Sequence, residues 1–372
     1  MINEKRLLNR FLRYVQIDSP TQNEREFAVC LKNEMEILGI EVYIDDAGAK
    51  VGSNTGNIIG LLKGSTTAEP ILFSSHMDTV TPSIGVKPII KDGIIYSDGT
   101  TILGGDDKAG IAAVMEAIEV IKENNITHGD IELAFTIFEE GGLLGSKNID
   151  YSKLRSKKAF VLDSGGDPGT IILQGPAQNK IGVKFIGKEA HAGVAPETGI
   201  SAIQMAGEAI SKMKLLRIDS ETTANIGSIS GGGATNIVTK EVSFHAEARS
   251  LDNDKLKEQT DHMVICCEDA AAKYGGKVEI IVENAYSAFT IDNSHEIVKT
   301  VEKACRNIGI ETKTTTSGGG SDTNIFNVNG IDAINLGIGE RKPHTLEEHM
   351  YIKDLENTAR IVLEIIKTSS LT

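Results

Sequence analysis

The chain has 372 residues, of which 40% are hydrophobic and 24% are charged, so it has ordinary globular composition and a length that favours about two domains. Its formal net charge of −14 excludes binding to nucleic acid or anionic lipid on charge alone. No apolar run approaches the length of a membrane span. We therefore expect neither a nucleic acid nor a membrane as a partner.

The N-terminus and the cysteines predict the compartment. Residues 1–6 lack the apolar segment of a signal peptide. The four cysteines, Cys30, Cys266, Cys267 and Cys305, do not have the spacing of zinc ligands. These features predict a reduced, cytoplasmic setting.

The first part of the chain alternates between helical and strand patterns. A short apolar run begins at Ile71, after Pro70, and ends in the triplet His76-Met77-Asp78, which predicts a buried strand with polar residues at its end. The other predicted elements are helices over 4–16, 24–38 and 111–122 and strands over 40–44, 56–62, 131–138 and 159–162. This alternation predicts an α/β domain with a mostly parallel sheet and helices on both faces.

The pattern changes near Gly175-Pro176. The next elements follow the order β-α-β-β-α-β, over 180–187, 199–214, 222–230, 241–250, 253–273 and 277–283. That order is the ferredoxin-like arrangement. It predicts an inserted α+β lid domain over 177–287, between the two segments of a catalytic domain, 1–176 and 288–372. The second of these segments resumes with a helix over 294–308, a strand over 331–336 and a helix over 353–367.

Several elements before or after the predicted strands end in residue types that bind metals. They are His76, Asp106, Glu139 with Glu140, Asp163 and His344. The carboxyl ends of parallel strands meet at one edge of a sheet, so we expect these side chains to converge. Two metal ions roughly 3.5–4 Å apart need a bridging carboxylate, ligands of their own and a spare carboxylate to activate water. Mixed His and carboxylate ligands suit Zn²⁺ with open positions, and also Mn²⁺ or Co²⁺.

Two glycine-containing turns shape this expectation. Adjacent residues of a strand point to opposite faces, but Gly141-Gly142 breaks the strand after Glu139-Glu140. One of these glutamates could then bind metal while the other takes a proton from water; taken alone, the pair could equally be a solvated acidic turn. Gly104-Gly105 precede Asp106 and allow a close backbone approach that an ordinary helix cap does not require.

A second glycine-rich loop, 317–322, contains Gly318 and Gly319. No Lys-Ser/Thr pair of a phosphate-binding loop follows it, and no dinucleotide-binding fingerprint is present. We interpret it as a loop that offers backbone N–H donors to a substrate.

These motifs, taken together and in order, resemble those of the two-zinc amidohydrolases. That family includes peptidase T, glutamate carboxypeptidase, succinyl-diaminopimelate desuccinylase and acetylornithine deacetylase. The resemblance covers nearly the whole chain, including the inserted lid, and the run 98–110 is most similar to peptidase T. The matching motifs are Ser75-His76-Met77-Asp78-Thr79-Val80, Gly104-Gly105-Asp106-Asp107-Lys108-Ala109-Gly110, Glu139-Glu140-Gly141, Asp163-Ser164-Gly165-Gly166 and the late His344.

The resemblance implies a set of metal ligands. His76 and Asp163 would hold one zinc ion, and Glu140 and His344 would hold the other. Asp106, the first of the Asp pair, would bridge the two ions. Co²⁺ or Mn²⁺ could replace zinc.

It also implies roles for residues that do not bind metal. Glu139 would be the general base, and Asp78 would brace the His76 imidazole. In the lid, His191 would reach the substrate or its oxyanion in the neighbouring subunit of a homodimer. Asn236 and Arg249 match positions that contact substrate.

The resemblance implies hydrolysis of peptide bonds in short peptides, by a tripeptide aminopeptidase in the first interpretation. A carboxypeptidase or an N-acyl-amino-acid deacylase would use the same two-metal chemistry. A free substrate carboxylate would need a cation such as Arg249, whereas a free α-amine would need a carboxylate. A metal-stabilised binding protein without catalysis is a further alternative, but it would have no use for the spare base Glu139.

Overall fold

The computed structural model describes residues 1–370 and divides into two compact units. The first comprises Met1–Gln174, Thr290–Ser317 and Ser321–Thr372, and the second comprises Gly175–Phe289 with Gly318–Gly320. The second unit therefore extends two residues beyond the predicted 177–287 at each end. Among the described residues, no helix has both the length and the apolar character needed to cross a membrane.

The first unit is built on a nine-stranded sheet in the order β1-β2-β6-β3-β7-β16-β8-β14, with β15 paired to β8. Its strands are β1 (Glu41–Ile44), β2 (Ile58–Leu62), β3 (Ile71–His76), β6 (Ile131–Thr136), β7 (Lys158–Ser164), β8 (Thr170–Gly175), β14 (Phe289–Thr290), β15 (Lys313–Thr316) and β16 (Asp332–Gly337). The central strands β6, β3, β7 and β16 run parallel. All six residues of β3 are buried, which explains why its sequence lacks a regular apolar and polar alternation.

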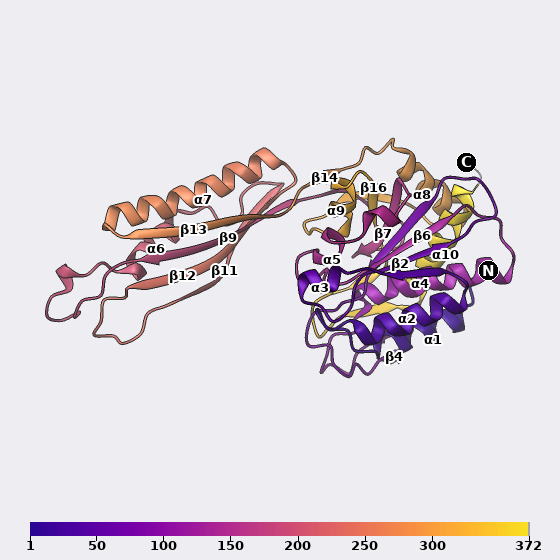
Figure 1. The fold of residues 1–372 in the computed structure, drawn as a ribbon, viewed down its shortest axis with the longest axis horizontal. Coiled ribbons are helices and arrows are strands. Elements are labelled where there is room, and N and C mark those ends of the chain that lie inside the picture. The colour runs from indigo at the N-terminus through magenta and orange to yellow at the C-terminus, as the bar shows by residue number, and fades with distance from the viewer. Residues whose placement is uncertain (371–372) are drawn as a thin grey trace. The chain divides into compact units, whose positions relative to one another are not determined.

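Helices pack on both faces of this sheet (Figure 1). The helices of the unit are α1 (Glu4–Val15), α2 (Arg25–Ile37), α3 (Ala47–Val51), α4 (Gly105–Glu123), α5 (Leu144–Lys147), α8 (Glu296–Asn307), α9 (Asp322–Val328), α10 (Ile352–Ser369) and the 3₁₀ turn η1 (Tyr151–Lys153). Leu72 and Val161 pack with Phe326 of α9 in one apolar cluster. The residues beside them in the strands, Phe73 and Phe160, contact each other with ring centroids 5.5 Å apart. Adjacent residues of a strand point to opposite faces, so both faces of the sheet carry a core.

A small antiparallel sheet, β17-β18-β5-β4, completes the first unit. It is formed by β4 (Ile89–Lys91), β5 (Ile94–Tyr96), β17 (Glu340–Arg341) and β18 (His349–Tyr351). The connection between β17 and β18 carries His344, so this sheet fixes both ends of a loop that contains a predicted metal ligand.

The second unit is an antiparallel sheet in the order β10-β11-β12-β9-β13 with two long helices (Figure 1). Its elements are β9 (Ala177–Ile186), η2 (Pro196–Thr198), α6 (Ala202–Lys212), β10 (Leu216–Arg217), β11 (Thr222–Gly231), β12 (Glu241–Ser250), α7 (Asn253–Tyr274) and β13 (Lys277–Tyr286). Alternate residues of the strands, including Phe185 and Phe244, pack with Met205 of α6 and Cys267 of α7. The four long strands and two helices follow the predicted ferredoxin-like order.

The predicted fold class is confirmed: a mostly parallel α/β sheet and a separate α+β domain. The prediction missed β8, β14, β15 and the small sheet; apart from β8, these strands have only two to four residues each. It also began helix α4 too late, at residue 111, whereas α4 begins at Gly105. Asp106 and Asp107 have non-helical dihedral angles in this first turn, so the helical sequence pattern starts only after them.

Candidate active site

Three parallel neighbours in the sheet place three predicted site segments at one edge. His76 is the last residue of β3 and pairs with Thr136, the last residue of β6. Asp163 lies near the end of β7, on the other side of β3. Glu139 follows the end of β6. Parallel pairing of β6, β3 and β7 therefore brings Glu139 and Asp163 near His76, although they lie 60 to 90 positions later in the chain. This convergence is expected at the carboxyl ends of parallel strands.

Asp106 lies between two imidazoles. Its Oδ1 is 2.9 Å from Nε2 of His76, and its Oδ2 is 3.2 Å from Nε2 of His344. Each carboxylate oxygen thus faces a different histidine. Such an arrangement is what a carboxylate that bridges two cations requires.

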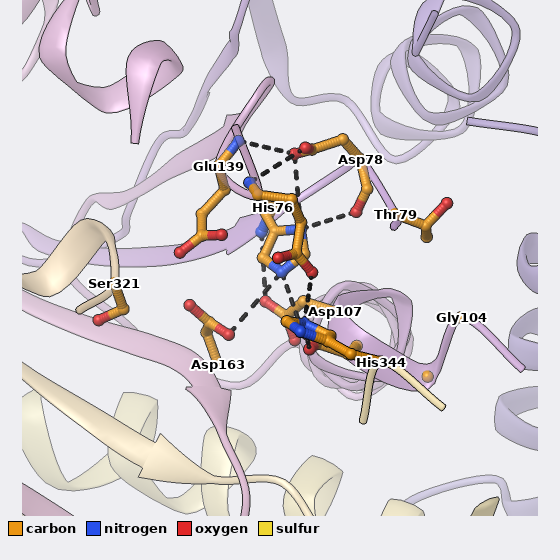
Figure 2. Close-up of polar contacts among 12 residues, drawn as sticks. His76, Asp78, Thr79, Gly104, Asp107, Glu139, Asp163, Ser321 and His344 are labelled. Atoms are coloured by element: carbon orange, nitrogen blue, oxygen red, sulfur yellow. Dashed lines mark hydrogen bonds and ion pairs between the residues drawn. The ribbon is translucent and has the colours of Figure 1, made fainter. Parts of the chain in front are cut away.

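Each histidine has one more carboxylate beside it. Nε2 of His344 is 2.8 Å from Oε1 of Glu140, and Nε2 of His76 is 3.8 Å from Oδ1 of Asp163. In Figure 2, Asp163 and His344 lie on one side of the His76 ring and Asp78 lies on the other. The other four residues predicted as ligands are therefore gathered around Asp106.

Asp107 is oriented differently from Asp106. Its Oδ2 accepts a hydrogen bond from the backbone N–H of His76 at 3.2 Å. The ligand atoms of His76, Asp106 and Glu140 lie within 4.8 Å of one another, as do those of His76, Asp107 and Asp163. Asp107 thus adds a negative charge to the site. Unlike Asp106, it has no contact with His344 among the described residues.

Asp78 holds the turn that carries the two glutamates. Its Oδ1 accepts from the backbone N–H of Glu139 at 2.9 Å, and its Oδ2 accepts from that of Glu140 at 3.2 Å and from the Thr21 hydroxyl at 2.9 Å. The His76 ring is held instead by the backbone carbonyl of Asp78, 2.8 Å from Nδ1; the carboxylate is 3.6 Å away. Of the two groups of Asp78 that face the His76 ring, the backbone carbonyl therefore makes the closer contact.

The charges of the site are strongly unbalanced. Burial and the nearby Asp163 raise the pKa of the Glu139 carboxyl well above its usual range. The His344 ring donates to the carboxylates of Asp106 and Glu140, and these hydrogen bonds raise the pKa of the imidazole to about 10. Burial opposes protonation of His76, but the carboxylates of Asp106 and Asp78, which accept from its ring nitrogens, still raise the pKa of the ring well above the ordinary value. The raised pKa values of Glu139, His344 and His76 show that the site favours the binding of positive charge.

This unbalanced charge fits a pair of divalent cations. Buried carboxylates are costly unless they are paired or bind a metal. Neutral imidazole nitrogens and carboxylate oxygens that face one another are ligands for Zn²⁺, Co²⁺ or Mn²⁺. The residues present therefore fit the metal centre that the sequence predicts.

The chain matches the model of the peptidase family M20/M25/M40 over residues 72–368. It belongs to this family. It is 48% identical to the uncharacterized protein YqjE of Bacillus subtilis over 370 residues, which is 100% of both chains.

Two solved structures are similar over essentially the full chain. One is a tripeptidase from Staphylococcus aureus, with 46% identity, a TM-score of 0.97 and coverage of 100% of both chains. The other is the aminopeptidase PepT from Bacillus cereus, with 45% identity, a TM-score of 0.92 and coverage of 99% of both chains. The resemblance inferred from the motifs is confirmed at the level of the family.

The remaining predicted residues of this M20 chain lie in the second unit. His191 and Asn236 are exposed and belong to two adjacent segments, joined where the N–H of Ala192 donates to the Asn236 carbonyl at 2.9 Å. Arg249 is half-buried on β12, and two of its nitrogens donate to Glu247, at 2.9 and 3.1 Å.

The glycine-rich loop also groups with this unit. Gly318 and Gly319 are exposed, whereas Gly320 packs against Tyr286. A Cβ at position 320 would lie 2.3 Å from the Tyr286 ring, so only glycine allows this approach.

The sequence analysis did not identify two buried acids that hold the loops of the site. Asp322 accepts from the hydroxyls of Thr136 and Ser146, both at 2.5 Å. Glu348 accepts from four consecutive backbone N–H groups, those of residues 103–106. Asp322 ends the Gly-rich motif and Glu348 lies four residues after His344, so proximity to a motif was the only signal for either.

Proposed function

We propose that the chain is a two-metal aminopeptidase that removes the first residue of tripeptides. The observation that carries this proposal is the Asp106 carboxylate, whose two oxygens face His76 and His344 at 2.9 and 3.2 Å. The similarity to a tripeptidase and an aminopeptidase over the whole chain supports the substrate class.

Two zinc ions would be held by the residues around Asp106. His76 and Asp163 would bind one ion, Glu140 and His344 the other, and Asp106 both. Bound ions would polarise the scissile carbonyl and lower the pKa of a water molecule between them. Co²⁺ or Mn²⁺ accept the same ligand types.

Glu139 would be the general base. Its backbone N–H is fixed by Asp78, and its carboxylate belongs to neither group of potential ligands among the described residues. A carboxylate in this position can accept a proton from the attacking water and pass it to the leaving amine.

The lid residues would complete substrate binding. We propose that Asn236, Arg249, Gly318 and Gly319 contact the peptide, and that His191 donates to the oxyanion from the second subunit of a homodimer. The Arg249 guanidinium already donates to Glu247 through two nitrogens. A cytoplasmic location stays a prediction.

A set of blocked peptides tests the proposal. The zinc-loaded protein is incubated with trialanine, its N-acetyl and C-amide derivatives, dialanine and N-acetylalanine, and the products are identified by mass spectrometry. We expect trialanine to yield alanine and dialanine, and N-acetyl-trialanine to remain intact. Cleavage of N-acetyl-trialanine at its C-terminal bond would show a carboxypeptidase, and release of acetate from N-acetylalanine would show a deacylase. No cleavage of any compound would contradict peptidase function.

A further inference from the structure

Glu348 is a buried acid that makes an unusual set of contacts. Its side chain is almost fully enclosed, with a residue exposure of 1%. Oε2 accepts from the N–H groups of Leu103 and Gly104 at 2.8 and 2.9 Å, and Oε1 accepts from those of Gly105 and Asp106 at 2.6 and 3.2 Å. We propose that Glu348 is a positioning residue of the metal centre, which fixes the main chain of Asp106 to the loop of His344. This inference rests on the proposed function.

The backbone of this turn is shaped to surround a carboxylate. Gly104 has a φ of +74°, in the left-handed region that favours glycine. A Cβ on Gly105 would lie 3.2 Å from Oε1 of Glu348, closer than most Cβ contacts. Successive N–H groups in such a turn form a concave site for an anion. The two glycines thus admit the Glu348 side chain, which explains the close approach that they were expected to allow.

The contacts replace hydrogen bonds that helix α4 cannot provide. The first N–H groups of a helix have no acceptor within it. Asp106 also departs from helical geometry, with φ −77° and ψ 103°, so the helix itself does not set its direction. An acceptor 242 residues later in the chain supplies the hydrogen bond to the Asp106 N–H. The orientation of this backbone determines where the two oxygens of the Asp106 carboxylate point.

The same acid belongs to the loop of the second histidine. Glu348 lies four residues after His344, and its own N–H donates to the Thr345 carbonyl at 3.0 Å. One side chain therefore joins the segments that carry Asp106 and His344, whose side chains are 3.2 Å apart. His344 is half-exposed, with 51% of its side chain accessible, so packing alone constrains it little. Without Glu348, each segment could move independently and the ligands would no longer be preorganised.

The expected change in zinc affinity follows from other metal sites in which a residue that holds a metal ligand is removed. Loss of a group that orients a ligand typically lowers metal affinity by about 10- to 100-fold. In Glu348→Gln an amide NH₂ replaces one carboxylate oxygen. Because this nitrogen cannot accept, the two backbone N–H groups that donated to that oxygen lose their acceptor and face another donor. We expect a 10- to 100-fold higher dissociation constant for Zn²⁺.

The experiment compares Glu348→Gln with Glu347→Gln, which removes the same charge from an exposed neighbour paired with Lys342. Zinc dissociation constants are measured by competition with a chromophoric chelator, and amide hydrogen exchange is measured in the peptide over residues 100–110. We expect weaker zinc binding and faster exchange of this peptide in Glu348→Gln only. A folded Glu348→Gln protein with zinc affinity within twofold of the wild type would overturn the inference.

The outcomes separate this inference from the proposed function. If the wild-type protein binds no zinc, the metal centre itself is wrong; if wild type and Glu348→Gln bind zinc equally, only the role of Glu348 is wrong. Circular dichroism of the metal-free proteins verifies folding. If Glu348→Gln does not fold, Glu348→Asp is tested by the same criteria. Failure of both to fold would show a general structural role and would also overturn the inference.

Discussion

Substitution of Glu139 by glutamine tests the chemistry most directly. Gln is nearly isosteric with Glu and retains the backbone N–H that donates to Asp78 at 2.9 Å. It cannot accept a proton at neutral pH, so the general base is removed while the site keeps its shape. Loss of a general base costs about 10²–10⁴-fold in kcat. This range corresponds to about 2.7–5.4 kcal/mol in activation free energy, at 1.36 kcal/mol per factor of ten.

The matched variant is Glu140→Gln, since Glu140 is adjacent and lies 2.8 Å from His344. Zinc content is measured by elemental analysis after dialysis, and kcat and KM are measured on a tripeptide. We expect Glu139→Gln to keep both metal ions with a KM near that of the wild type, and Glu140→Gln to lose one ion. If Glu139→Gln loses metal while Glu140→Gln retains it, the roles of the two glutamates are reversed. A fully active Glu139→Gln protein would refute the mechanism.

Three further predictions concern the metals, the lid and the glutamate turn. Exhaustive chelation should abolish activity and Zn²⁺, Co²⁺ or Mn²⁺ should restore it, whereas reducing agent should have no effect; full activity in a protein shown to be metal-free would contradict this. His191→Ala should stay folded, dimeric and zinc-loaded but lose about 10²–10³-fold in kcat, and mixing it with Glu139→Gln should restore activity in hybrid dimers. Inactive mixtures with proven subunit exchange would exclude action across the dimer. Asp78→Ala should lower the free energy of unfolding by about 1–3 kcal/mol or more in chemical denaturation, because buried donors lose their acceptor; the exposed Asp269→Ala should have little effect.

The sequence predicted the elements whose patterns are local. The amphipathic helices α1 (Glu4–Val15) and α7 (Asn253–Tyr274) begin and end within a residue or two of the predicted ranges. Strand β12 (Glu241–Ser250) coincides with the prediction, because apolar and polar residues alternate along it. Helical and strand periodicities are properties of neighbouring residues, so no tertiary contact is needed to read them.

The sequence could not predict the strands that depend on partners. β15 (Lys313–Thr316) is mostly exposed and consists of lysine and threonines, and it is a strand only because it pairs with β8. The small sheet joins β5 to β18 across more than 250 residues. Hydrogen bonding between distant segments, and not local propensity, determines these strands.

In the candidate site, too, some features could be predicted from the sequence and others depend on the tertiary structure. The residue types and their positions at strand ends were sufficient to nominate His76, Asp106, Asp163 and Glu139 with its neighbour. Parallel pairing of β6, β3 and β7 makes such residues converge whatever their separation in the chain.

The hydrogen bonds that hold these residues were decided only by the tertiary structure. Asp78 was expected to brace the His76 ring, and its backbone carbonyl lies 2.8 Å from Nδ1, but nothing in the sequence indicated that its carboxylate would accept from the N–H groups of Glu139 and Glu140. Glu348 lies in a polar segment where no spacing distinguishes it from Glu347, yet one is buried against four N–H groups and the other is exposed. Every residue except proline has a backbone N–H, so the sequence does not indicate which of them a buried carboxylate will bind. That choice is set by the tertiary structure.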